Sequence, residues 1–156
     1  MTNKLPPSAF YKIKDPKHFF PAMRSDIKLL QDNARYTTCM TVIMCCIDAV
    51  AAGEGEANPG KFAAFAEKYL PQICDGLANT VTGKSGAQVL YDKYRNGLCH
   101  LRGPKSGFGI AEDHELCGKY TGVIEIDGVC KFMAVNMDRF TKDFLALLEQ
   151  FEKDAP

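Results

Sequence analysis

Apolar residues recur along most of this chain at intervals of three and four, which is the spacing of amphipathic helices. The pattern predicts four longer helices, one that begins near Pro21 and three that span about residues 33–52, 59–70 and 139–153. The second of these is apolar almost all round between Cys39 and Ala51, with Thr41 and Asp48 as exceptions. A helix that is apolar on all sides is typical of the centre of a bundle, so we expect this one to be buried.

The pattern changes in the last third of the chain. The segment Gly103–Gly109 is rich in glycine and contains a proline, which predicts a loop. Two runs rich in β-branched residues, at 121–126 and 129–135, then flank the dipeptide Asp127-Gly128, which is a strong hairpin signal. Because a lone hairpin is marginally stable in water, we expect it to pack on the helices or to pair across an interface.

The sequence therefore predicts an all-α fold, an up-down bundle of four to five helices with one β-hairpin before the C-terminal helix. We expect Asp138 to cap that last helix, because an aspartate side chain accepts hydrogen bonds from the free N–H groups of a first turn. The length of 156 residues suits one helical domain over residues 1–156. Prolines near the start disfavour helix, so Met1–Lys14 is expected to be an extended arm.

The stretch Tyr91–His100 holds the densest group of residues suited to phosphate chemistry, and as a helix it presents one narrow apolar stripe. That stripe comprises Ala87, Leu90, Tyr94, Leu98 and Leu101. Measured around the helix from Tyr94, Arg95 lies at about 100°. On the same scale Asn96 lies at about 200° and His100 at about 240°. The three polar side chains are therefore expected to point away from the core.

The residues Arg95-Asn96-Gly97-Leu98-Cys99-His100 place an arginine, a polar residue and a histidine at helical spacing. This pattern resembles the R-x4-6-H motif of the HEPN superfamily (higher eukaryote and prokaryote nucleotide-binding), in which asparagine often follows the arginine. The segment from Tyr69 to His100 is also similar to uncharacterised bacterial HEPN-like proteins. The resemblance implies a helical bundle and, in active members, metal-independent RNA cleavage at a composite site between two protomers.

Carried over residue by residue, the resemblance implies three catalytic roles. His100 would act as a general acid or base, since the pKa of an imidazole lies near neutrality. Arg95 would hold the scissile phosphate through its forked guanidinium, and Asn96 would orient the histidine or the phosphate. The family's composite site implies a homodimer that binds RNA or a nucleotide. No metal and no cofactor are expected.

Local charge around the motif favours an anionic partner, because from Tyr91 to Lys105 four basic residues stand against the single acid Asp92. The expected substrate-binding residues are Lys93, Arg102, Lys105 and Phe108, the last through stacking on a base. A purely structural interpretation stays open. In it, Arg95 pairs with Asp92 one turn earlier, and His100 caps the C-terminus of the helix.

Two other functions also stay open. One is a non-catalytic helical interaction module, by family analogy a partner of a nucleotidyltransferase or of an antitoxin. The other is a small-ligand binder with a pocket between the second helix and the hairpin. A dry interface over His100 would favour the interaction module. A deep apolar pocket remote from His100 would favour the ligand binder.

Composition indicates the cellular compartment of the protein more than its function. Lysine plus arginine and aspartate plus glutamate number 19 each, so the global charge gives no argument for nucleic acid. We expect no membrane span and no secretory signal, because long uninterrupted apolar runs are absent from the sequence. Seven cysteines without a Cys-x-x-Cys pair predict reduced thiols in the cytoplasm. Six of them are expected to be small core residues: Cys39, Cys45, Cys46, Cys74, Cys99 and Cys130.

Overall fold

The computed structural model describes Lys4, Ile13 and residues 15–156, so the predicted arm at Met1–Lys14 lies outside the described residues except at those two positions. The helical segments are α1 (Pro16–Asp32), α2 (Tyr36–Ala52), α3 (Pro59–Tyr69), α4 (Pro71–Leu77), α5 (Gly86–Val89), the π-helical η2 (Leu90–Arg95), α6 (Asn96–Leu101), the 3-10 helix η3 (Asp113–Leu116) and α7 (Met137–Asp154). The strands are β1 (Phe108–Ala111), β2 (Thr121–Ile126) and β3 (Cys130–Asn136). Within the described part of the chain, no helix has the length and apolar character needed to cross a bilayer.

Three helix starts differ from the prediction: α2 begins at Tyr36 rather than near residue 33, and in α1 and α7 other side chains cap the first turns. α1 begins at Pro16 rather than near Pro21, since the side chain of Asp15 accepts a hydrogen bond from the backbone N–H three residues later. α7 is capped by Asn136 rather than by Asp138, and the side-chain oxygen of Asn136 likewise accepts from the N–H three residues later, over 3.1 Å.

The predicted hairpin is confirmed, but the predicted all-α bundle with that hairpin alone is wrong. β2 and β3 are antiparallel, and their turn has left-handed backbone at Asp127 (φ 53°) and Gly128 (φ 67°). β3 also pairs in parallel with β1, which makes a three-stranded mixed sheet of order β1-β3-β2. β1 was not predicted because the glycines and the proline of Gly103–Gly109 indicate a loop. β1 has only four residues, and its partner β3 lies far along the sequence.

Tyr94 holds β1 and β3 against the helix that carries the predicted motif. Its buried hydroxyl lies 2.9 Å from the carbonyl oxygen of Gly109 and 3.0 Å from that of Met133, one on each strand. Its ring packs edge-on against Phe108, with centroids 5.9 Å apart. Burial raises the pKa of the Tyr94 hydroxyl well above its usual range, so the group stays protonated and available as a donor.

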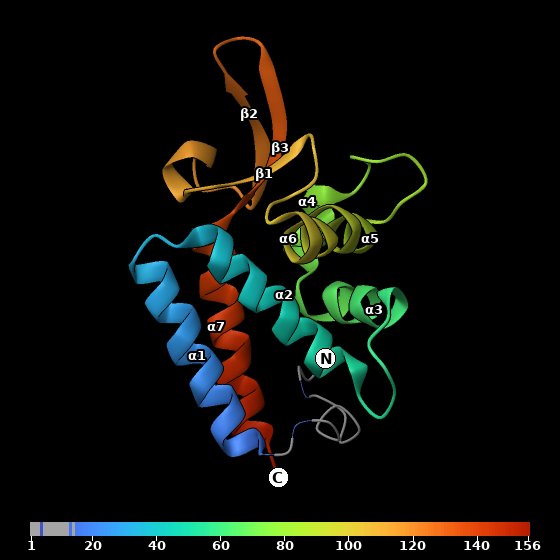
Figure 1. Cartoon of the computed structure of the whole chain (residues 1–156), viewed down its shortest axis with the longest axis vertical. Helices are drawn as coiled ribbons and strands as arrows, with labels where there is room; N and C mark the ends of the chain where they lie inside the picture. The colour runs from blue at the N-terminus through green and yellow to red at the C-terminus, as the bar shows by residue number, and fades with distance from the viewer. Residues whose placement is uncertain (1–3, 5–12, 14) are drawn as a thin grey trace.

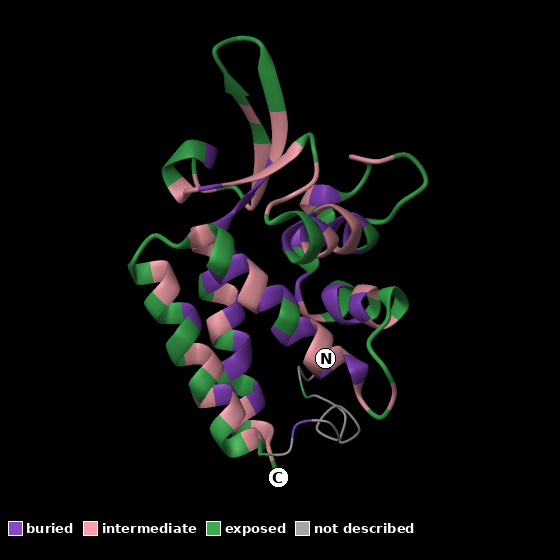
Figure 2. Cartoon of the chain, viewed as in Figure 1, coloured by how far each residue is buried: buried purple, intermediate pink, exposed green. Residues whose placement is uncertain are grey.

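Figure 1 shows α1 and α7 side by side, α2 crossing them, and α3 to α6 on the far side of α2. The sheet lies at the opposite end of the molecule from the C-terminus, and the β2–β3 hairpin projects away from the helices. Figure 2 shows the tip of that hairpin exposed and α2 buried along much of its length. The side chains that α2 places in the core include Met40, Ile43, Met44, Ile47 and Val50. The predicted central position of this helix is therefore confirmed.

Candidate functional site

The helix that carries the predicted motif changes its winding just before the motif begins. Leu90–Arg95 form a π-helical segment between α5 and α6, and the N–H of Asn96 bonds to the carbonyl of Tyr91, five residues earlier. π-helical turns are rare and are frequent at functional sites, because the wider turn changes the direction of the side chains on it. The sequence analysis assumed a regular α-helix through this stretch, and at Arg95 the backbone is π-helical instead.

The predicted apolar stripe holds except at its last member. The buried members are Ala87, Leu90, Tyr94 and Leu98. Leu101 is 66% exposed, so its predicted place in the core is wrong. The reason is that the helix ends at Leu101, Arg102 adopts left-handed backbone (φ 61°), and the chain turns back over Gly97 instead of covering the last turn.

Gly97 provides the space that this returning loop requires. A Cβ atom at Gly97 would lie 2.6 Å from the carbonyl oxygen of Gly103 and 2.8 Å from the nitrogen of Lys105. The backbone N–H of Lys105 donates to the carbonyl of Lys93 over 2.8 Å, which holds the loop on the helix. Gly97 therefore belongs to a tight contact between backbones, and any side chain there would push the loop away.

Arg95 is held on three sides. Its Nε donates to Oδ2 of Asp48 on α2 over 2.7 Å, and its Nη1 donates to Oδ1 of Asn96 over 3.1 Å. The guanidinium carbon lies 5.3 Å from the ring centroid of Tyr91, in cation–π range. Burial by itself would lower the pKa of Arg95, but the hydrogen bond and charge of Asp48 outweigh it and raise that pKa, so the group stays cationic. Within the described residues Nη2 makes no hydrogen bond, and 22% of the side chain is exposed.

Asp92 is surrounded by lysines and does not pair with Arg95, so the structural interpretation of an Arg95–Asp92 pair is wrong. Asp92 accepts from Nζ of Lys105 at 2.8 Å and of Lys84 at 2.9 Å, with Nζ of Lys93 at 3.3 Å. The hydrogen bonds from Lys105 and then Lys84 hold the pKa of Asp92 far below its usual range. Three cations around one carboxylate leave this cluster, which we call the Asp92 cluster, with excess positive charge.

The predicted substrate-binding residues are divided by the structure. Lys93 and Lys105 meet in the Asp92 cluster, and Phe108 lies beneath it, with its ring centroid 5.8 Å from Nζ of Lys93. Arg102 is exposed at the end of α6 and makes no ion pair with any described residue. The basic residues thus lie along one helix and its returning loop, with the ring of Phe108 partly buried inside.

His100 is exposed in the last turn of α6, four residues after Asn96. Its neighbours Cys99 and Leu101 are exposed as well. The motif therefore combines an arginine fixed by its own chain with a histidine open to solvent. Each side chain has chemistry that an anionic ligand can use, since a guanidinium binds a phosphate and an imidazole exchanges a proton.

Sequence reasoning missed Asp48 as the partner of Arg95. The available signal was its place as the only acidic residue in the apolar run of α2, where an unpaired carboxylate would be costly. Three cysteines were also predicted wrongly. Cys45, Cys99 and Cys130 were expected in the core, but they are exposed. The spacing of apolar residues alone did not separate these thiols from the buried ones.

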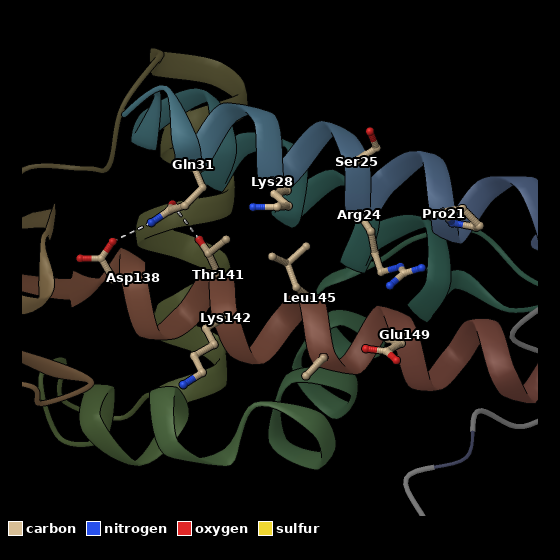
Figure 3. A pocket seen from close by; sticks show the side chains of 11 residues that line it. Pro21, Arg24, Ser25, Lys28, Gln31, Asp138, Thr141, Lys142, Leu145 and Glu149 are labelled. Carbon is tan, nitrogen blue, oxygen red and sulfur yellow. Dashed lines mark hydrogen bonds between the residues drawn. The ribbon is translucent and has the colours of Figure 1, made fainter.

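Two hollows among the described residues lie away from the motif. A groove of about 610 Å³ runs between α1 and α7, and Figure 3 shows the residues that line it, most of which carry a polar or charged group. In it Gln31 donates to Asp138 over 2.7 Å and accepts from Thr141 over 3.1 Å. A smaller hollow of about 320 Å³ lies between the start of α2, β1 and η3, and not against the hairpin as the ligand-binding alternative expected. Neither hollow lies between α2 and the hairpin, where this alternative expects its pocket.

The residues that the structure describes include no group of three or more histidine, cysteine or acidic side chains that could hold a metal ion. No family model, no curated protein and no solved structure matches this chain. The motif and the geometry around it are therefore the features of this chain that bear on its function.

Proposed function

We propose that this chain is a HEPN-like RNA-binding protein that cleaves RNA without a metal ion, through Arg95, Asn96 and His100 in a homodimer. The observation that carries the proposal is the pairing of a fixed arginine with an exposed histidine on one helix. Asp48 and Asn96 hold the guanidinium over 2.7 and 3.1 Å, and the imidazole is open to solvent at the end of the same helix.

The chemistry assigns a separate task to each side chain. Arg95 presents Nη2 and a permanent positive charge to a phosphate, which stabilises the charge that develops during cleavage. His100 takes the proton from a ribose 2′-hydroxyl or donates one to the leaving oxygen. Both tasks are needed in one cycle, and a second protomer related by a two-fold axis supplies a second histidine. Exposed Leu101 beside His100 offers apolar surface for that contact.

The surrounding charge suits an RNA strand. The Asp92 cluster carries excess positive charge, and exposed Arg102 adds another cation near the end of α6. Contacts between basic side chains and phosphates supply affinity that does not depend on sequence. Unbridged thiols throughout the chain are consistent with work in a reducing compartment, and we place the protein in the cytoplasm.

The test is cleavage of a fluorescent single-stranded RNA by the purified chain in the presence of EDTA. We expect cleavage that EDTA does not affect and that His100→Ala and Arg95→Ala each abolish, with an unchanged helical circular dichroism spectrum. His114→Ala is the matched control, because this second exposed histidine lies on η3, outside the motif. Cleavage that persists in His100→Ala would remove the enzymatic proposal.

One observation favours a second candidate, a non-catalytic helical interaction module that partners a nucleotidyltransferase or an antitoxin. Two of the guanidinium nitrogens of Arg95 are already engaged inside the chain, and the adjoining surface contains the apolar Leu101. This candidate predicts that RNA is neither bound nor cleaved. It also predicts that Leu101→Glu disrupts association and that Leu29→Glu, at an equally exposed leucine on α1, does not.

A further inference from the structure

Two of the four exposed cysteines lie on adjoining turns of α2 and α6. Cys45 lies three residues before Asp48 on α2, and Cys99 lies four residues after Arg95 on the motif helix. Asp48 and Arg95 meet at 2.7 Å, so the adjoining turns of the two helices also lie together. Cys45 and Cys99 are thus each one helical turn away from this ion pair, on the facing sides of α2 and α6.

The other cysteines have no such partner. Cys39, Cys46 and Cys74 are buried in the core. Cys130 lies opposite Ile126 in the β2–β3 ladder, next to the hairpin turn. Cys117 lies before the first residue of β2, at the other end of the hairpin. The seven thiols therefore include one exposed pair on adjoining turns of two packed helices.

We propose that Cys45 and Cys99 are a peroxide-sensitive dithiol that closes to a reversible disulfide and links α2 covalently to α6. Cytoplasmic disulfides are usually transient and redox-sensing, so this pair is compatible with otherwise reduced thiols. The proposal concerns the two sulfur atoms alone and stands independently of RNA cleavage.

The reaction takes two steps, with hydrogen peroxide as the oxidant. A thiolate of the pair attacks one peroxide oxygen, the O–O bond breaks, and a sulfenic acid and hydroxide form; the hydroxide takes up the proton that the thiol released. The second thiol then attacks that sulfur, the S–S bond forms and the S–OH bond breaks, and its own proton leaves with the hydroxide as water. Two thiols are oxidised, one peroxide is reduced, and two water molecules are produced.

The surroundings suggest which sulfur reacts first. Burial, and then the neighbouring Cys99, raise the pKa of Cys45, which disfavours its thiolate. Cys99 is exposed in the last turns of α6, where peroxide reaches it directly, and the guanidinium of Arg95 lies within electrostatic range of both thiols. We therefore assign Cys99 as the sulfur that meets the peroxide and Cys45 as the thiol that resolves the sulfenic acid.

The test treats the reduced full chain with a small excess of hydrogen peroxide, followed by blocking of free thiols, tryptic digestion and mass spectrometry. Cleavage after arginine and lysine places Cys45 in fragment 36–61 and Cys99 in fragment 96–102. We expect these two fragments to be joined. The mass of the joined species should be the sum of the two fragment masses less two hydrogen atoms, and dithiothreitol should separate the fragments. The joined fragments should disappear in Cys45→Ser and in Cys99→Ser.

Cys117→Ser and Cys130→Ser are the matched controls, because both thiols are exposed and should not affect the linkage. Fragment 36–61 also contains Cys39 and Cys46, so a linkage that survives Cys45→Ser would overturn the assignment. Oxidation that yields only sulfinic acids or disulfides between chains would overturn it as well. RNA cleavage does not enter any of these measurements, so the outcome is separate from that of the RNA proposal.

Discussion

Nε of Arg95 lies 2.7 Å from Oδ2 of Asp48, and this ion pair joins the motif helix to the central helix of the molecule. Both side chains are largely covered, at 22% and 14% exposed, so water screens the pair less than it would on an open surface. The pair therefore has two consequences. It fixes the direction of the guanidinium, and it compensates the acidic residue within an apolar helix.

We expect Asp48→Ala to lower the free energy of unfolding by about 1–3 kcal/mol, because it leaves a partly buried guanidinium without its acceptor. Urea denaturation followed by circular dichroism measures the loss. The matched control is the same substitution in an Arg95→Ala background, where the partner is already absent. An equal loss in both backgrounds would show that the pair itself contributes nothing to stability.

Gly97→Ala is expected to destabilise the chain by about 1–3 kcal/mol, since the added methyl group meets the backbone of the returning loop. Helix propensity alone favours alanine by about 1 kcal/mol, so the sign of the change reports which effect dominates. Gly103→Ala is the control, because a Cβ there meets no atom within 4 Å. Thermal unfolding of both variants decides the matter, and a stabilised Gly97→Ala would contradict the close contact.

Asp92→Asn should lower the free energy of unfolding at pH 7 by roughly 1 kcal/mol, because three lysines lose a partly exposed partner. The folded state depresses the pKa of Asp92. Its contribution is therefore complete above the unfolded pKa of about 3.9 and is lost as the pH falls through the depressed folded value.

The measurement for Asp92 is denaturant unfolding of wild type and Asp92→Asn between neutral and acidic pH. The difference between the two proteins should be constant near neutrality and should shrink toward zero in acid. Asp26→Asn is the control, because Asp26 is exposed on α1 and makes no ion pair with a described residue. A difference that does not vary with pH would argue against the lysine contacts.

Local spacing was sufficient to predict several features. The apolar run of residues 39–51 places α2 at the centre, and the inward stripe through Tyr94 and Leu98 follows from helical geometry. Asp127-Gly128 predicts the hairpin turn, because both residues accept the left-handed backbone that the turn requires. The exposed position of His100, opposite this stripe, also follows from the geometry of one helix.

The remaining features depend on contacts between distant segments. The parallel pairing of β1 with β3, the choice of Asp48 as the partner of Arg95 and the placing of Cys45 and Cys99 on adjoining helical turns join residues that lie far apart in sequence. The sequence by itself determined that α2 is central, that Tyr94 and Leu98 face inward and where the hairpin turns, because these are properties of neighbouring residues, whereas it placed Leu101, Cys45 and Cys99 wrongly. Only the tertiary structure decided which charges and thiols meet, because that depends on how the helices pack and on the loop that returns over Gly97.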